Sequence, residues 1–346
     1  LDYRISGDLD IASGDTVYLS AGTKFLFDGS YHFNIYGTLK AIGTETDSII
    51  FDNIEDNGER WEGFTLDNVS DETEFRYVRI SGAEKGAGGG MNLNGSDPIL
   101  AHVTINGNTV GTFGGGMLVV RSDPTLTHVT ISGNTAGTFG GGITIFESDP
   151  TFTHVTISGN TAGTTGGGMF VDESDFIFIH VTISGNTAEN NSGGMYIQRS
   201  NPILTNVTIS GNTTGNSGGG IHLIQVDLIL TNSIIWDNSP EGIYFSTYLD
   251  PNTISIQYSD IEGGEDGIIT NDNGEVYWLE GNIDTDPLFT DPENGDYTLQ
   301  AGSPCIDAGT ADLDGDGEDD IEYIGAAPDM GAFEFVENIP STISVE

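Results

Sequence analysis

A short acidic segment late in the sequence has the spacing of a calcium-binding loop. Its carboxylates at Asp312, Asp314, Asp316 and Asp320 fall at positions 1, 3, 5 and 9 of such a loop, and a glycine stands at position 6. The glycine permits the sharp turn that directs several carboxylates at one hard cation. The bidentate glutamate of such loops is missing at position 12, where Tyr323 stands. We therefore predict a structural calcium site, with a metal-free acidic loop as the alternative.

A column of histidines is the second candidate for chemistry. His102, His128, His154 and His180 recur every 26 residues, so in a stacked repeat their rings would lie roughly 5 Å apart. So many equivalent positions do not make one metal site, and they match no arrangement of a catalytic nucleophile. We expect stacked rings that mutual repulsion keeps neutral, with metal binding as the alternative.

Apolar side chains recur at outward positions of the same repeats and form a candidate partner surface. The members are Leu118, Val120, Phe146, Phe170 and Tyr196. An apolar, aromatic stripe that faces water is unusual for a monomer. It would suit a surface glycan, whose sugar rings stack on aromatic rings, or a lateral protein contact. Burial beneath a loop is the alternative.

The histidine column and the apolar stripe belong to a repeat that is kept without insertions. Its copies begin at Gly88, Gly114, Gly140, Gly166, Ser192 and Gly218, which are 26 residues apart. A fixed period of this size indicates a solenoid, in which each unit buries its apolar edge against its neighbours.

Apolar columns within the repeat show which kind of solenoid this is. Met117 and Val119 are two residues apart, as are Val129 and Ile131, and the other copies keep this spacing. Spacing two is that of a strand, and no window has the helical pattern of apolar residues. An asparagine that recurs from Asn108 suits a left-handed corner and a stack of hydrogen-bonded amides. The sequence predicts an all-β, right-handed parallel β-helix of about eleven coils, six of them regular.

The sequence motifs of the repeats resemble those of a known group of proteins. The phrases Gly-Gly-Gly-Met and Ile-Ser-Gly-Asn-Thr-Ala are similar to those of right-handed parallel β-helix repeat proteins of bacterial surfaces. The later phrases Ala-Gly-Ser-Pro-Cys-Ile-Asp-Ala-Gly and Pro-Asp-Met-Gly-Ala-Phe-Glu resemble the choice-of-anchor Q module, which follows β-helices in secreted proteins. The resemblance implies an extracellular or cell-surface protein of the bacterial secreted type.

Composition and repeats divide the chain into four parts. We expect irregular coils and a cap in residues 1–87 and regular coils in 88–239. Residues 240–335 would hold shorter coils, the anchor-type module and the acidic loop, and 336–346 a tail or linker. The start at Leu1 without methionine suggests a mature secreted protein. No apolar run is long enough to span a membrane.

The charge of the chain limits its partners. The sequence has 53 acidic and 9 basic residues, for a formal charge of −44. Such acidity opposes binding to nucleic acid, anionic lipid or a polyanionic sugar, and it suits divalent cations. The single cysteine, Cys305, allows no internal disulfide, and we expect it to be buried and inert.

An enzymatic reading is available because polysaccharide lyases and hydrolases share the β-helix fold. They need a basic residue and carboxylates that converge in a groove. The regular coils offer two arginines, no lysine and no long loop. Only Glu147 and Glu173, which lie one coil apart, are candidates for a catalytic pair of carboxylates. We therefore expect no enzymatic activity. A polysaccharide-binding or polysaccharide-cleaving protein is the alternative function.

The preferred function is a structural or adhesive surface protein that self-associates. Seven of the nine basic residues precede residue 88, and the acidic loop lies near the other end, so head-to-tail attraction could build a fibre. Ile343 and Val345 in the tail would then pair with the open edge of the next subunit. A minor alternative is ice binding by the outward Thr-x-Ser array that begins at Thr104.

Overall fold

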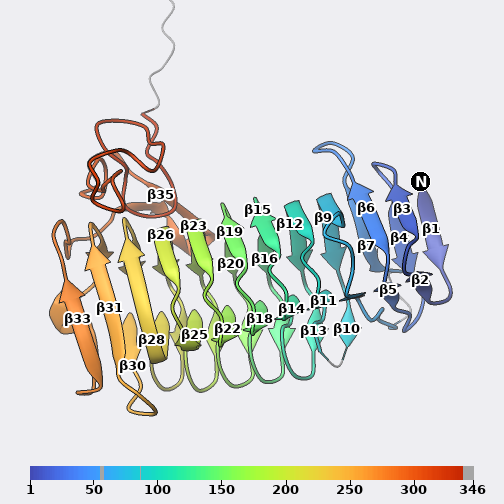
Figure 1. Cartoon of the computed structure of the whole chain (residues 1–346), viewed down its shortest axis with the longest axis horizontal. Coiled ribbons are helices and arrows are strands. Elements are labelled where there is room, and N and C mark those ends of the chain that lie inside the picture. Colours follow the sequence, from blue (N-terminus) through green and yellow to red (C-terminus); the bar gives the residue numbers. More distant parts are fainter. Residues whose placement is uncertain (55–57, 86, 338–346) are drawn as a thin grey trace, which may run out of the picture.

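The computed structural model describes residues 1–54, 58–85 and 87–337, which form one long solenoid of parallel strands (Figure 1). Its two helical elements within these ranges are the short 3-10 turns η1 (Glu265–Gly267) and η2 (Pro292–Asn294). The solenoid makes about ten turns, close to the eleven coils expected. The predicted all-β parallel β-helix is therefore confirmed. Nothing helical in the described ranges is long and apolar enough to cross a membrane.

Three long parallel ladders run the length of the solenoid. Sheet I contains β2 (Leu9–Ile11), β5 (Phe33–Ile35), β8 (Phe64–Asp67), β11 (Met91–Asn94), β14 (Met117–Val120), β18 (Ile143–Phe146), β22 (Met169–Asp172), β25 (Met195–Ser200), the start of β28 (Ile221–Thr231) and β30 (Ile243–Phe245). Sheet II contains β3 (Thr16–Leu19), β6 (Thr38–Ile42), the starts of β9 (Glu74–Ser81), β12 (Ile99–Asn106), β23 (Ile177–Ser184) and β26 (Ile203–Ser210), β15 (Thr125–Thr127), β19 (Thr151–Thr153), the end of β28, β31 (Asn252–Gln257) and β33 (Gly274–Trp278).

Sheet III forms the third face of the solenoid. It contains β1 (Asp2–Ile5), β4 (Lys24–Phe27), β7 (Ile49–Asn53), the ends of β9, β12, β23 and β26, β16 (Thr130–Ser132), β20 (Thr156–Ser158), β29 (Ile234–Trp236) and β32 (Asp260–Ile261). A fourth, minor ladder joins β10 (Glu84–Lys85), β13 (Thr109–Val110), β17 (Thr135–Ala136), β21 (Thr161–Ala162), β24 (Thr187–Ala188) and β27 (Thr213–Thr214).

The register between coils follows the 26-residue period. Met117 pairs with Ile143, which pairs with Met169, and all three side chains are fully buried. Each predicted apolar column therefore lines the interior, and one continuous core fills the solenoid. Burial of these columns supplies the main favourable free energy of folding, since each coil removes apolar area from water only by stacking.

Buried asparagines hold the coils in this register. The Nδ2 of Asn134 donates to Oδ1 of Asn160 (3.0 Å) and to the carbonyl of Ile105 (2.9 Å). The backbone N–H of Asn134 donates to the same Oδ1 of Asn160 (2.9 Å). The amide stack predicted from the sequence is confirmed. Its expected left-handed backbone is wrong, because the preceding Gly133 takes the positive φ of 62° instead.

Glycine in the Gly-Gly-Gly triplet is required by the approach of one backbone to the next. A Cβ at Gly115 would lie 2.2 Å from the carbonyl oxygen of Gly141, and a Cβ at Gly141 would lie 2.4 Å from that of Gly167. No side chain fits in such a gap, so the middle glycine is set by packing between coils and not only by local conformation.

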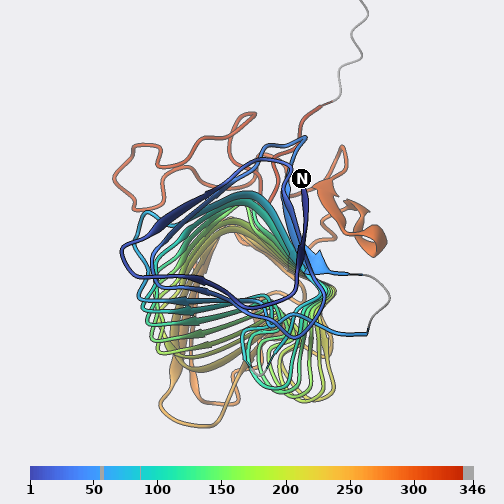
Figure 2. The same cartoon turned by 90° about the vertical axis from the view of Figure 1, so that its right-hand side faces the viewer.

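The C-terminal segment, residues 284–335, leaves the helical path and lies on the outside of the solenoid (Figures 1 and 2). It contains the hairpin of β34 (Phe289–Asp291) and β35 (Asp296–Leu299). A second small core forms where Phe289, Tyr297, Leu299 and Met330 pack against Ile234 of the solenoid. The segment thus covers part of sheet III instead of extending the stack.

Polar contacts fix the C-terminal segment on two corners of the solenoid. Asn206 donates to the carbonyl of Asp329 (2.9 Å), and Asn232 exchanges two hydrogen bonds of 2.8 Å with the backbone of Thr310. These asparagines occupy the column that carries histidine in earlier repeats. The change from histidine to asparagine therefore coincides with the place where this segment docks.

A buried carboxyl group also joins the segment to the solenoid. Asp260 accepts hydrogen bonds from the backbone N–H of Thr285 (3.1 Å) and from the Cys305 thiol (3.2 Å). Burial raises the pKa of Asp260 from 3.8 to about 6, although the Thr285 bond opposes the rise. Because the folded state holds this proton more tightly, the contribution of Asp260 to stability falls as the pH rises from about 4 to about 6. Burial, reinforced by Asp260, raises the pKa of the free Cys305 thiol, which fits the expected inert cysteine.

Candidate functional site

Three basic and two acidic side chains line one cavity on the outer face of sheet III, in the first coils. Lys24, Arg60 and Arg79 supply the positive charges, and Asp2 and Asp52 supply the negative ones. The cavity has a volume of about 510 Å³, which lies within the range of about 300–1,000 Å³ typical of small-molecule sites. We call it the cation pocket. Its formal charge of 3 − 2 = +1 is exceptional in a chain of net charge −44.

Strand register explains why these residues meet. Asp2 pairs with Lys24, Lys24 with Ile50, and Ile50 with Arg79, so the four side chains share one outward column on successive coils. Asp52 belongs to the adjacent outward column, two residues further along its strand. Arg60, which lies between β7 and β8 in the sequence, also lines the cavity.

The positive charges of the cation pocket are only loosely neutralised. Lys24 Nζ lies 3.8 Å from a carboxylate oxygen of Asp2, and the guanidinium of Arg79 lies 3.3 Å from one of Asp52. Arg60 makes no hydrogen bond or ion pair with the rest of the described residues. Exposed pairs of this kind contribute little stability, so a ligand anion can replace their carboxylate partners at small cost.

Hydroxyl side chains continue the same face beyond the cation pocket. Thr104, Thr130 and Thr156 follow Arg79 in its column, and all three are partly exposed. Further along, Thr182 and Thr208 are buried beneath the C-terminal segment. The flat Thr-x-Ser array considered for ice binding is thus open over three coils and covered beyond them.

The sequence did not predict the cation pocket, because converging charges were expected only in the regular coils. The pocket instead lies where the outward column has not yet become threonine. The available signal was the pattern of β4, β7 and β9, in which Lys24, Asp52 and Arg79 stand at outward positions of strands. The irregular lengths of these coils hid the register that aligns them.

The apolar stripe expected to face water lies largely under loops. Leu118 and Phe170 are buried, with exposed fractions of 8% and 6%, and Val120, Phe146 and Tyr196 are half-buried. The ring of Phe139, from the loop between β17 and β18, stacks on Phe170 at a centroid distance of 4.7 Å. The alternative of burial beneath a loop thus holds for Leu118 and Phe170, whereas Val120, Phe146 and Tyr196 keep part of their surface exposed. Burial raises the pKa of Tyr196 to about 12.

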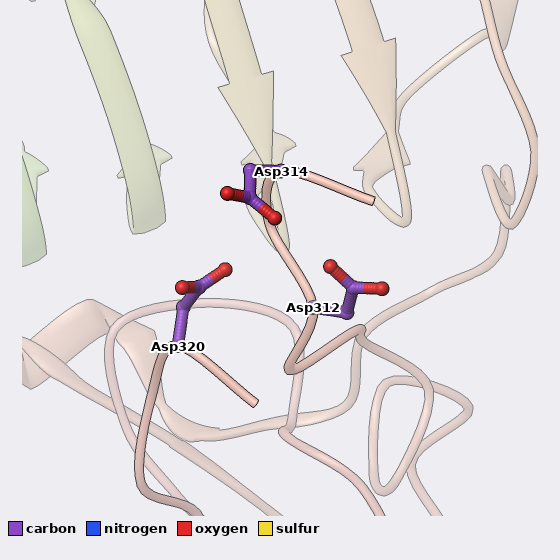
Figure 3. A group of neighbouring side chains, drawn as sticks. All are labelled: Asp312, Asp314 and Asp320. Atoms are coloured by element: carbon purple, nitrogen blue, oxygen red, sulfur yellow. The ribbon is translucent and has the colours of Figure 1, made fainter. Parts of the chain in front are cut away.

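Three of the four predicted calcium ligands converge. One carboxylate oxygen from each of Asp312, Asp314 and Asp320 lies within 4.8 Å of the others (Figure 3). The backbone N–H groups of Gly315 and Gly317 donate to Asp312 at 2.7 and 2.9 Å and shape the turn. These oxygens are the hard ligands that calcium prefers.

Asp316 stands apart from this group. Its carboxylate is not among the converging oxygens, and it accepts the backbone N–H of Glu318 instead (2.8 Å). The loop therefore closes differently from the pattern of positions 1, 3, 5 and 9, in which Asp316 would be a ligand.

The histidine column forms the predicted stack. Tyr77, His102, His128, His154 and His180 follow one another with ring centroids 4.4 to 4.8 Å apart. Burial and the neighbouring rings lower the pKa of His154, and burial lowers that of His180. The parallel rings of a stack do not converge on one point, so the geometry favours structural corners. The backbone at each histidine is left-handed, with φ from 53° to 54°.

The carboxylate pair considered for catalysis also occupies corners. Glu147 and Glu173 have φ of 48° and 53° and are exposed, and Arg199 Nε lies 3.1 Å from Glu173. Glu173 lines a cavity of about 320 Å³ together with Arg199 and Asp227, but Glu147 is not among the residues that line it, so the two glutamates do not act on one site there. Ile343 and Val345, the expected polymer contacts, lie outside the described residues.

Comparison with known proteins agrees with this architecture. Residues 62–226 match a family model described as "Right handed beta helix region". The chain is also similar to a solved structure, the crystal structure of pectate lyase Pel9A, with a TM-score of 0.52 and 14% identity over 91% of this chain and 88% of that chain. At that identity the likeness shows the fold alone. No curated protein matches the sequence. The chain thus has the fold of a right-handed parallel β-helix.

Proposed function

We propose that this chain is an extracellular β-helix protein that binds polysaccharide, and that the cation pocket holds an acidic sugar of the glycan. The observation that carries the proposal is the convergence of Lys24, Arg60 and Arg79 on one cavity. Ammonium and guanidinium groups form charge-assisted hydrogen bonds with carboxylates, and the planar guanidinium can bind both carboxylate oxygens at once.

The net charge of the chain does not exclude an anionic ligand at this place. At physiological ionic strength the Debye length is about 8 Å, so carboxylates on distant coils are screened from the cation pocket. A short acidic oligosaccharide is favoured over a long polyanion, because a long chain would meet the acidic remainder of the surface.

The neighbouring face and the fold support a sugar ligand. The partly exposed Thr104, Thr130 and Thr156 offer hydroxyl groups along sheet III next to the cation pocket. The solved structure named a pectate lyase has the same fold, which supports a polysaccharide ligand at the level of architecture only. The C-terminal segment, by its resemblance to the choice-of-anchor Q module, would connect this rigid rod to a cell surface.

Binding without cleavage is the form of the proposal that we favour. The likeness to a lyase, and Lys24 beside two carboxylates, make cleavage the second candidate. Neutralising the carboxylate of a uronate acidifies the adjacent C–H, which is the first requirement of elimination. The pocket carries no pair of groups whose roles as acid and base are apparent among the described residues.

We expect the full chain to bind trigalacturonate in isothermal titration calorimetry, with an affinity that falls as salt is added. Arg79→Gln should weaken binding about tenfold or more, because one charged hydrogen bond contributes about 1.5–3 kcal/mol. Arg76→Gln is the matched control, since Arg76 is also exposed on β9 but pairs with Glu74 outside the pocket. Equal binding by the wild type and Arg79→Gln would contradict the proposal.

Formation of an unsaturated, ultraviolet-absorbing product that is lost in Lys24→Gln would establish cleavage.

We also propose that Asp312, Asp314 and Asp320 hold a structural calcium ion. A cation bound only by the folded state raises stability, by about 2.7 kcal/mol when its concentration is a hundred times Kd. Calcium should therefore raise the melting temperature, and chelator should reverse the rise. Asp314→Asn should abolish this response and Asp316→Asn should keep it, because the Asp316 carboxylate lies outside the converging group. Loss of the response in both variants to the same degree would show that the loop does not bind through these three oxygens.

End-to-end association into a fibre is a further candidate that one observation favours. In the first coil β1, β2 and β3 pair on one side only within the described residues, and Tyr3, Ile5 and Leu9 are only partly covered. Sedimentation velocity of the full chain with calcium should then show large assemblies that disappear when residues 337–346 are deleted. A monomer at all calcium and salt concentrations would exclude a fibre.

A further inference from the structure

The last regular repeat departs from the others at two neighbouring outward positions. The first repeat has Asn106-Gly107 there and the next four have a serine and a glycine, as in Ser158-Gly159, whereas this repeat has Trp236 and Asp237. Asp237 keeps the left-handed backbone of the glycines, with φ of 56° against 62° at Gly159. Aspartate is one of the few side chains that takes this region readily, so the change from glycine adds a carboxylate at this corner and keeps the backbone as it is.

Both exceptional residues line a cavity between the solenoid and the C-terminal segment. The cavity has a volume of about 270 Å³, and its other walls include Asp286, Pro292 and Gln300 of that segment. This is just below the range of about 300–1,000 Å³ of small-molecule sites, so it has room for one sugar ring. We call it the tryptophan pocket.

The free polar atoms of the tryptophan pocket are mostly acceptors. The Asp237 carboxylate accepts no hydrogen bond from another described residue, and one oxygen of Asp286 is used by the N–H of Leu288 (2.9 Å). Gln300 donates its Nε2 to the carbonyl of Phe289 (2.7 Å), which leaves its side-chain oxygen. The indole N–H of Trp236 has no acceptor among the described residues. A ligand that fits must therefore bring several donors and at most a few acceptors.

We infer that the tryptophan pocket binds one uncharged sugar ring. Sugar hydroxyls supply the donors that Asp237, Asp286 and Gln300 require, and the apolar face of a pyranose packs on the indole. The two carboxylates repel acidic sugars. The pocket lies six coils from Arg79, or roughly 29 Å at the spacing of adjacent strands, so it is separate from the cation pocket and does not depend on the proposed function.

A packing role for Trp236 is the competing explanation. Trp236 lies against the second core, where Ile234, Phe289 and Tyr297 meet. That role explains a large side chain at position 236. It does not explain a carboxylate in left-handed backbone at position 237, where glycine serves in the five earlier repeats at Gly107, Gly133, Gly159, Gly185 and Gly211.

Calorimetric titration of the full chain with cellotetraose, mannotetraose and maltotetraose tests the inference, with tetragalacturonate as the acidic comparison. We expect binding of at least one neutral tetrasaccharide, and tetragalacturonate should not compete with it. Trp236→Ala should weaken that binding about tenfold or more, and Trp236→Phe should weaken it less, because a ring remains for stacking. Arg79→Gln should leave it unchanged, which separates this result from a failure of the cation pocket.

Asp237→Gly is a second variant with which binding can be tested if Trp236→Ala disturbs folding. It restores the residue of the earlier repeats, which takes the left-handed backbone at this corner freely, so the melting temperature should not fall by much. Its affinity for the neutral sugar should fall about tenfold or more, since a charged acceptor is removed. Absence of binding by all three neutral tetrasaccharides, or wild-type affinity in Asp237→Gly, would overturn the inference.

Discussion

Hydrogen bonding between equivalent positions 26 residues apart is the constraint on which this structure depends. Oδ1 of Asn160 accepts both the backbone N–H and the side-chain Nδ2 of Asn134, and Asn160 in turn donates to Asn186. These groups are fully buried, so a coil that slipped by one residue would leave several polar atoms without partners. It would also turn the apolar columns outward, because side chains alternate along a strand. Register is therefore fixed twice, by buried amides and by the core.

Fixed register decides where binding chemistry can arise. Inward positions belong to the core, and the asparagine and glycine positions belong to the contact between coils. Only outward positions and turns are free to vary, and along sheet III most of them carry threonine or serine. The two candidate pockets lie where that pattern stops, at Lys24 and Arg79 near one end and at Trp236 and Asp237 near the other. The regular coils between them act as a rigid spacer.

Periodicity made the regular part of the fold predictable from the sequence. Strand spacing predicted the core columns, and the period predicted both the amide stack and the stack from His102 to His180. Sequence patterns could not predict contacts between segments that do not share the 26-residue period. Loops that cover Phe170, the docking of Cys305 on Asp260, and the alignment of Lys24 with Arg79 all depend on the path of irregular segments. Asp316 was assigned from a motif, and the turn in this chain directs its carboxylate elsewhere.

Deletion of one whole coil tests most directly the claim that the repeats are interchangeable spacers set by contacts between neighbours. Removing residues 140–165 joins Phe139 to Gly166, so the Gly-Gly-Gly triplet and every column are restored with His128 stacked on His180. Nearest-neighbour stability predicts cooperative unfolding with a small loss of stability, and unchanged affinities at both pockets, which lie on opposite sides of the deletion. Failure to fold, or loss of binding at either pocket in a folded protein, would contradict this account.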